Sequence, residues 1–192
     1  MAKIIMTGLT GLVGSAFIVE LLRREADLDV VALVRGRGNS RAVDRAKAAL
    51  IEQCQLDGLE DHFEDIWSRI EVIEADVADL KPHWPIERCK GADTVFHCAA
   101  DVNLGKDPYG KTFSTNYRGT KNMLDLAAEC GAADFHLVST AYVAGKFQGV
   151  AMEDQLIEDE PCNNAYEKSK RHCEALVRQA GMPFTIYRPS II

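Results

Sequence analysis

The sequence predicts an α/β protein built on a doubly wound parallel sheet, and two observations carry this prediction. Short apolar runs of strand length alternate with longer segments of helical periodicity along the 192 residues, a pattern typical of a parallel sheet with helices on both faces. In addition, three glycines lie between the first of these strands and the first helix. No linker, low-complexity tract or repeat interrupts the pattern, so we expect a single domain over residues 1–192.

The first half of the chain contains three expected strands and three expected helices. In chain order they are a strand at 4–6, a helix at 15–24, a strand at 29–34, helices at 42–54 and 56–70, and a strand at 71–75. The strand at 29–34 is dense in β-branched residues, as expected of a strand that is buried on both faces. Asn39 or Ser40 is positioned to cap the helix at 42–54.

The second half continues the alternation. Its expected elements are a strand at 93–100, a helix at 111–130, a strand at 134–139, an irregular segment at 141–163, a helix at 164–179 and a strand at 183–188. The long irregular segment follows directly on a strand. We therefore expect residues 142–163 to form one wall of a pocket at the carboxyl edge of the sheet.

Composition excludes several classes of protein. The chain is 47% hydrophobic and 27% charged with a formal net charge of −7, which argues against wholesale binding of nucleic acid or of an anionic membrane surface. No apolar run reaches transmembrane length, and the N-terminal run is too short for a signal peptide. The six cysteines and five histidines show no metal-ligand spacing, so we expect no metal and a cytoplasmic protein with reduced thiols.

The glycine-rich turn at residues 7–14 is the strongest motif. Gly8, Gly11 and Gly14 stand between a strand and a helix, where they permit a tight turn, close approach of a pyrophosphate, and close helix–strand packing. The free N–H groups and partial positive charge of the helix N-terminus then face the phosphates. We expect contacts to a dinucleotide from Thr7, Gly8, Thr10, Gly11, Leu12, Val13 and Gly14.

The residues after the second strand favour NADPH over NADH. An acidic residue that binds the ribose 2′-hydroxyl is expected about 20 residues beyond the glycines. Arg35 stands there instead, with Arg37 behind it, and the nearest acid, Asp29, lies at the start of the strand. A guanidinium binds a 2′-phosphate through paired, charge-assisted hydrogen bonds.

A group of polar side chains suited to carbonyl reduction follows the fifth strand. Tyr166 and Lys170 are four residues apart and so share one helical face, while Ser139 and Thr140 end a strand at the edge where parallel sheets bind ligands. Tyr166 would protonate the oxygen of a reduced carbonyl, and Thr140, helped by Ser139, would orient it. We expect the Lys170 cation to lower the pKa of Tyr166.

These motifs resemble those of the extended short-chain dehydrogenases/reductases. The glycine pattern at 7–14 and the Tyr-x-x-x-Lys pattern at 166–170 carry the superfamily resemblance. Further segments are similar to the fatty acyl-CoA reductase and thioester reductase branch, namely those at 33–35, 97–103, 116–120, 138–145 and 187–192. The resemblance implies a Rossmann fold and covers nearly the whole chain.

The resemblance also implies roles for individual residues. Asp76 and Val77 would contact the adenine, Ala99 and Ala100 would line the nicotinamide half, and Arg45 would assist Arg35. Thr140 occupies the catalytic Ser/Thr position, with Ser139 beside it. Ser139, Tyr166 and Asn116 are also expected at the cofactor, and Lys170 would hold the nicotinamide ribose. Asn116 is either a proton relay or a polar residue that bends its helix, and the sequence leaves both readings open.

Extended members of this superfamily continue into a substrate-binding region after the sixth strand, where this chain stops. We therefore expect a cofactor-binding fragment that lacks the C-terminal substrate region. Apolar surface left open at the last strand should make it dimerise, aggregate or be marginally stable unless NADPH is bound.

Three functions are compatible with these residues. The first is NADPH-dependent reduction of an acyl thioester, either acyl-CoA or carrier-bound, to an aldehyde or alcohol. The second is another carbonyl chemistry of the extended family, such as that of a sugar-nucleotide epimerase or dehydratase. The third is a non-catalytic dinucleotide-binding sensor or scaffold, against which the intact Thr140, Tyr166 and Lys170 argue.

Overall fold

The fold is an open six-stranded parallel sheet with helices on both faces, as expected, and is seen in a computed structural model that describes residues 2–80 and 84–190. The strands are β1 (Ala2–Thr7), β2 (Leu28–Val34), β3 (Ile70–Glu74), β4 (Thr94–His97), β5 (Asp134–Val138) and β6 (Phe184–Tyr187). The α-helices are α1 (Leu12–Arg24), α2 (Ala42–Asp57), α3 (Phe63–Ser68), α4 (Ile86–Cys89), α5 (Lys111–Cys130) and α6 (Ala165–Gln179). Short 3₁₀ turns are η1 (Glu60–His62), η2 (Val77–Asp79) and η3 (Ala141–Ala144).

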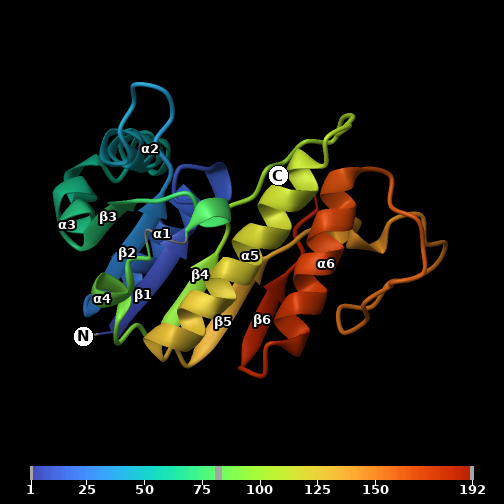
Figure 1. The fold of residues 1–192 in the computed structure, drawn as a ribbon. Coiled ribbons are helices and arrows are strands. Elements are labelled where there is room, and N and C mark those ends of the chain that lie inside the picture. Colours follow the sequence, from blue (N-terminus) through green and yellow to red (C-terminus); the bar gives the residue numbers. More distant parts are fainter. Residues whose placement is uncertain (1, 81–83, 191–192) are drawn as a thin grey trace.

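The order of the strands fixes where a ligand can bind. The sheet runs β3-β2-β1-β4-β5-β6, so the chain reverses its winding direction between β1 and β4 (Figure 1). All neighbouring pairs are parallel, and Thr7 at the end of β1 lies opposite His97 at the end of β4. Ligands of open α/β sheets bind at the carboxyl edge at this reversal point.

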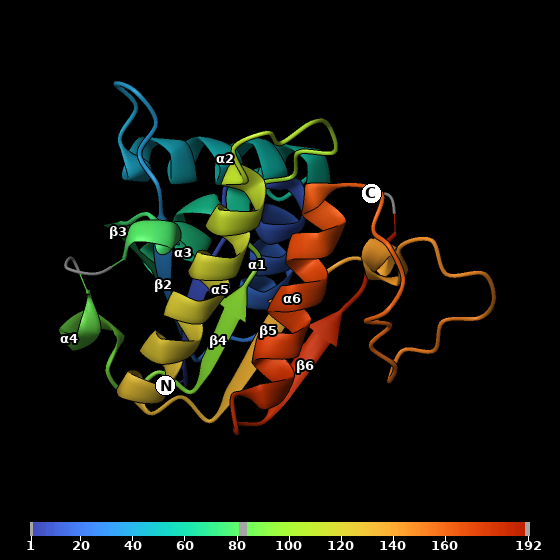
Figure 2. The same cartoon turned by 45° about the vertical axis from the view of Figure 1, so that its right-hand side comes forward.

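Two apolar cores hold the helices on the two faces of the sheet. On one face, α1, α2 and α3 pack on the sheet around fully buried residues such as Ile18 and Leu50. On the other face, α5 and α6 lie side by side over β4, β5 and β6 (Figures 1 and 2), around fully buried residues such as Met123 and Phe135. Successive side chains along each strand point to opposite faces of the sheet, so each central strand contributes apolar residues to both cores. The continuous apolar runs in the sequence predict this burial on both faces.

The expected single helix over residues 56–70 is wrong. α2 continues to Asp57 and ends at Gly58, whose φ of +66° favours glycine, after which η1 and α3 form and Ile70 already begins β3. The apolar residues of this stretch still face the core, because Phe63 and Ile66 are buried in it.

The cap expected from Asn39 or Ser40 is also absent. Arg41 precedes α2 and makes no side-chain capping bond. Instead, Glu74 at the end of β3 accepts a hydrogen bond from the N–H of Ala42 at 3.0 Å. A carboxylate at this helix end also matches the favourable direction of the helix dipole.

The last strand leaves apolar surface open, as expected. Phe184 and Tyr187 in β6 are 40% and 41% exposed. A hollow of about 580 Å³ lies beside β6, and it is lined by Val13, Phe17, Phe96, Val138, Glu153, Ile186, Tyr187, Arg188 and Pro189. Within the described residues, no helix is long and apolar enough to cross a membrane.

Candidate active site

The glycine-rich turn is shaped by contacts that leave its middle position free. A side chain at Gly8 would lie 2.7 Å from the backbone of Ala99, and Gly8 has a φ of +81°. A side chain at Gly14 would lie 2.2 Å from the carbonyl oxygen of Gly8. At Gly11 the nearest atom would be 3.5 Å away, an ordinary contact. Packing therefore explains the first and third glycines but not the middle one, where the absence of a side chain leaves room for a ligand.

The N-terminus of α1 is open to such a ligand. Gly11 precedes the helix and supplies no side-chain cap, so the first N–H groups keep hydrogen-bonding capacity for an anion. The turn is thus suited to a pyrophosphate.

Thr7, predicted to contact the cofactor, points into the protein. Its buried hydroxyl lies 2.7 Å from Nδ1 of His97 and accepts hydrogen bonds from the N–H groups of Cys98 and Ala99 at 3.2 and 3.1 Å. Because these two N–H groups occupy the hydroxyl as an acceptor, the hydroxyl donates to His97. Thr7 therefore links the ends of β1 and β4 beneath the glycine-rich turn.

A cleft of about 570 Å³ lies along this edge of the sheet. The predicted cofactor residues that line it are Gly8, Thr10, Gly11, Leu12, Val13, Gly14, Arg35, Arg45, Asp76, Val77, Ala99, Ala100 and Asn116. Its length along the ends of four neighbouring strands suits an extended dinucleotide.

Sequence reasoning missed the rest of the lining. Those residues are Leu9, Leu33, Val34, Ala75, Cys98, Asp101, Val102, Lys111 and Thr115. Most of them end a strand or begin the loop after it, and that position in the alternating pattern was the available signal.

Arg35 and Arg45 gather at one end of the cleft. Arg45 donates hydrogen bonds to the backbone carbonyl of Arg35 and, at 3.4 Å, to the hydroxyl of Thr10. Arg35 pairs with Asp76 at 3.4 Å, but both side chains are largely solvated, so the pair is weak. Asp76 is itself held by accepting a hydrogen bond from the N–H of Ala78 at 2.9 Å.

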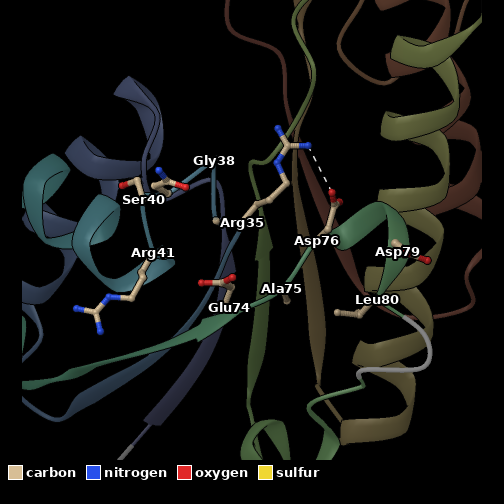
Figure 3. A pocket seen from close by; sticks show the side chains of 11 residues that line it. Arg35, Gly38, Ser40, Arg41, Glu74, Ala75, Asp76, Asp79 and Leu80 are labelled. Atoms are coloured by element: carbon tan, nitrogen blue, oxygen red, sulfur yellow. Dashed lines mark hydrogen bonds and ion pairs between the residues drawn. The ribbon is translucent and has the colours of Figure 1, made fainter.

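A second hollow of about 460 Å³ adjoins this end of the cleft (Figure 3). It lies between the loop after β2 and the end of β3, and it shares Arg35, Ala75 and Asp76 with the cleft. Arg41 also lines this hollow, but it pairs with Asp44 at 2.9 Å and points away from Arg35 in Figure 3. Arg35 is thus the cation shared by the two cavities.

The predicted catalytic residues lie at the ends of β5 and on α6. Ser139 and Thr140 follow β5 directly, and Tyr166 and Lys170 face the sheet from α6. All four are buried. The Lys170 ammonium donates to the carbonyl of Val138 in β5, which holds the helix against the strand end that carries the two hydroxyls.

The expected lowering of the Tyr166 pKa by Lys170 is wrong for the protein as it stands. Burial raises the pKa of Tyr166, since desolvation disfavours the phenolate. Burial likewise lowers the pKa of Lys170, because the ammonium is removed from water. The sequence spacing predicted the shared helical face, but not how deeply that face is buried.

Ser139 and Asn116, two polar residues beside these groups, differ in their hydrogen bonding. Oγ of Ser139 is buried without a hydrogen-bond partner, so it is available to a bound molecule. Asn116 on α5 donates to Oγ of Ser169 at 2.8 Å and exchanges hydrogen bonds with the backbone of Asp101. Asn116 therefore joins α5, α6 and the cleft loop.

The chain matches the family model NAD_binding_4, described as "Male sterility protein", over residues 6–192. The chain belongs to this family. Among the curated relatives of this chain, the non-canonical nonribosomal peptide synthetase FrzA of Cladobotryum sp is 30% identical over 99% of this chain and 19% of that protein. Fatty acyl-CoA reductase 8 of Arabidopsis thaliana is 29% identical over 83% of this chain and 35% of that protein.

Two solved structures have a fold similar to that of this chain. The terminal R domain of the myxalamid PKS-NRPS pathway superposes with a TM-score of 0.80 at 29% identity, over 99% of this chain and 49% of that one. A UDP-glucuronic acid 4-epimerase of Bacillus cereus, in complex with NAD, has a TM-score of 0.69 at 23% identity and so shares the fold. The chain spans about half or less of the length of these relatives. The relatives include a fatty acyl-CoA reductase and an R domain, in agreement with the family resemblance expected from the sequence.

Over residues 2–80 and 84–190, no group of three or more acidic, histidine or cysteine side chains is placed to hold a metal ion.

Proposed function

We propose that this domain binds NADPH and reduces an acyl thioester, carried by coenzyme A or a carrier protein, to an aldehyde or alcohol. The single observation that supports the proposal is that β1, β4 and β5 are neighbours in the sheet, so the glycine-rich turn after β1 and Thr140 after β5 lie at the same sheet edge. The glycine-rich turn, open at Gly11, and the buried Tyr166, Lys170 and Thr140 come from distant parts of the chain.

The residues that would hold the cofactor fit a dinucleotide. The turn at 7–14 would bind the pyrophosphate, Asp76 and Val77 would contact the adenine, and Ala99 and Ala100 would line the nicotinamide half. Lys170 would hold the nicotinamide ribose. Gly11, where the protein's own packing does not demand a glycine, supports this placement.

In the proposed reaction the catalytic side chains divide proton donation, orientation of the carbonyl oxygen and charge stabilisation between them. A bound NADPH supplies a hydride to the thioester carbonyl carbon. Tyr166 donates its phenolic proton to the carbonyl oxygen, and the resulting hemithioacetal breaks down to an aldehyde and a free thiol. Thr140 and Ser139 orient the carbonyl oxygen by hydrogen bonding, and the Lys170 ammonium stabilises the phenolate that remains.

The raised pKa of Tyr166 is consistent with its role as an acid. A buried phenol stays protonated at neutral pH, as a proton donor must be before the reaction. Once substrate and cofactor are bound, the positive charge of Lys170 would stabilise the phenolate of Tyr166 as the phenolic proton is transferred.

The decisive test is Tyr166→Phe, assayed with NADPH and an acyl-CoA. We expect turnover to fall about 10²-fold or more, because only the proton donor is removed, while the dissociation constant for NADPH stays within about twofold. Lys170→Ala should lower both turnover and cofactor affinity. Near-normal turnover of Tyr166→Phe would contradict the catalytic assignment.

A panel of substrates separates the alternatives. Wild-type protein that converts sugar nucleotides but no thioester would favour the epimerase-like or dehydratase-like chemistry. Wild-type protein that binds NADPH and converts neither class would favour a dinucleotide-binding sensor or scaffold.

A further inference from the structure

The segment at residues 142–163 joins the catalytic Thr140 to the helix that carries Tyr166. Apart from η3 it has no regular secondary structure, and long irregular segments next to active sites commonly serve as mobile lids. Here, however, arginine side chains from α6 and from the residue after β6 bind its backbone. The carbonyls that receive these hydrogen bonds are those of Val143, Met152, Asp154, Gln155, Glu158 and Glu160.

Arg171 makes the most central of these connections. It follows Lys170 on α6 and is only 6% exposed. Its Nε donates to the carbonyl of Val143 at 2.8 Å, and its Nη1 donates to the carbonyls of Glu158 and Glu160. One rigid, planar guanidinium thus binds both the start and the end of the segment. Among the described residues, Arg171 has no carboxylate ion-pair partner, so these carbonyls solvate its charge.

The hydrogen bond from Arg171 to Val143 binds the short turn that Thr140 caps. Thr140 caps η3 by accepting a hydrogen bond from the N–H of Tyr142 at 3.3 Å, and Val143 belongs to the same turn. Arg171 therefore fixes the turn that begins at Thr140 to the helix that carries Tyr166. This connection acts together with the bond from Lys170 to Val138 in setting the spacing between the two proposed catalytic hydroxyls.

Arg188 holds the middle of the segment in a similar way. It donates to the carbonyls of Met152 and Gln155 at 3.2 and 2.7 Å. The same guanidinium forms a two-point ion pair with Glu174, whose side chain is fully buried in α6, at 3.0 and 2.6 Å. A paired and buried guanidinium has a defined orientation, so the segment is tied to α6 here as well.

Gly145 shows how closely the segment is fitted to Arg171. Its φ is +62°, and a side chain there would lie 2.5 Å from Nη2 of Arg171 and 2.5 Å from the carbonyl oxygen of Pro161. The N–H of Lys146 donates to that same carbonyl at 2.9 Å. The two ends of the segment therefore pack against each other around the guanidinium.

We propose that residues 142–163 form a fixed wall of the substrate site rather than a lid, and that Arg171 is the positioning residue that keeps this wall and Thr140 in register with Tyr166. The inference rests on the proposed function for its substrate side. Its structural side concerns the free protein alone.

The structural side is tested by amide hydrogen exchange on the full chain without cofactor or substrate. We expect exchange in peptides from 142–163 to be at least tenfold slower in the wild type than in Arg171→Gln, with β1 and β4 peptides unchanged. Arg178→Gln is the matched control, because Arg178 donates a single bond of 3.3 Å, to Asp154. Wild-type exchange at the rate of an unstructured peptide, or no change in Arg171→Gln, would overturn the proposal.

If Arg171→Gln does not fold, Arg171→Lys replaces it, since lysine keeps the charge and a donor but cannot bind both ends of the segment at once. We expect this variant to loosen 142–163 while the strands stay protected. A fully protected segment in Arg171→Lys would count against the proposal in the same way.

The catalytic side is tested by steady-state kinetics with a thioester. We expect Arg171→Gln to lower kcat roughly 10–100-fold, because small displacements of positioned groups have effects of this size, while the dissociation constant for NADPH stays within about twofold. Equal losses of activity, cofactor affinity and thermal stability would indicate general destabilisation and contradict a positioning role. A wild type inert toward thioesters contradicts the proposed function, whereas hydrogen exchange still decides whether the wall is fixed.

Discussion

The pKa of His97 is strongly shifted from its ordinary value. It is fully buried at the end of β4, and burial, with the Lys170 charge, lowers its pKa to about 3. The imidazole is therefore neutral in the folded protein at any pH at which the enzyme would work. It serves as the acceptor for the hydroxyl of Thr7.

This shift predicts that acid weakens the fold. An unfolded chain protonates its imidazole near pH 6.5, whereas folded His97 stays neutral until about pH 3, so stability falls as the pH is lowered through this window. Between pH 7.5 and 5.5 we expect His97 alone to reduce the free energy of unfolding by roughly 1 kcal/mol. Urea unfolding of the wild type and of His97→Gln at both pH values measures this loss of stability.

The comparison between the two proteins isolates the histidine, because carboxylates titrate equally in both. The wild type should lose more stability on acidification than His97→Gln does. Identical losses would mean that His97 is protonated in the folded protein or exposed to solvent.

Single residues show how far the sequence can be trusted. The spacing of Tyr166 and Lys170 is local, so it correctly predicted a shared helical face. The pKa of Tyr166 depends on what α6 packs against, and the expected direction was wrong. Thr7 belongs to a motif that contacts cofactors, yet its hydroxyl is occupied by partners about 90 residues away in the sequence.

At the scale of an element, the loop after β2 predicts the cofactor preference. The side chain of Arg35 is 62% exposed, lines the cleft and, among the described residues, forms a weak ion pair with Asp76 alone. We expect NADPH to bind more tightly than NADH. Arg35→Ala should weaken NADPH binding about tenfold or more through the loss of charge-assisted hydrogen bonds, and it should leave NADH binding nearly unchanged. Titration calorimetry at several salt concentrations measures both constants.

Arg41→Ala provides the control for this loop. Arg41 carries the same charge six positions later but pairs with Asp44 and does not line the cleft. It should therefore leave the preference intact. Equal affinities of the wild type for the two cofactors, or equal effects of the two substitutions, would exclude the role given to Arg35.

Element boundaries were predicted where the signal is local and missed where it is not. α5 has the predicted bounds, because its periodicity runs without interruption between polar loops. The cap of α2 comes from Glu74, 32 residues beyond the N–H that it accepts, and no local pattern announces it. The arginines that bind the 142–163 segment lie 11 to 36 residues beyond the carbonyls that accept their hydrogen bonds, so the sequence predicted only an irregular stretch.

At the scale of the whole molecule, the open side of β6 predicts self-association. The hollow there combines exposed Tyr187 with the ring of Phe96, which stacks on Phe17 at 4.0 Å. Apolar patches of this kind commonly mediate association. We expect sedimentation velocity to show dimers or larger species at tens of micromolar, and Tyr187→Glu to shift the protein toward monomer. A wild type that is monomeric at all concentrations would contradict this.

Cofactor binding should stabilise the whole domain as well. A ligand that binds the folded state alone adds about 2.7 kcal/mol at a hundredfold excess over its dissociation constant. For a domain of this size that corresponds to a rise in Tm of roughly 5–10 °C. Thermal melts with NADPH, NADH and no addition measure it, and an unchanged Tm with NADPH would exclude tight binding.

The position of β1 in the middle of the sheet also governs how the chain can fold. β1 is made before the other five strands, and β2 follows it soon afterwards, but its second neighbour, β4, lies about 90 residues further along. Until His97 has left the ribosome, the edge of β1 that will become the centre of the sheet has no partner. Pairings this distant slow folding, so we expect the nascent chain to expose an unpaired, aggregation-prone strand edge until β4 is made.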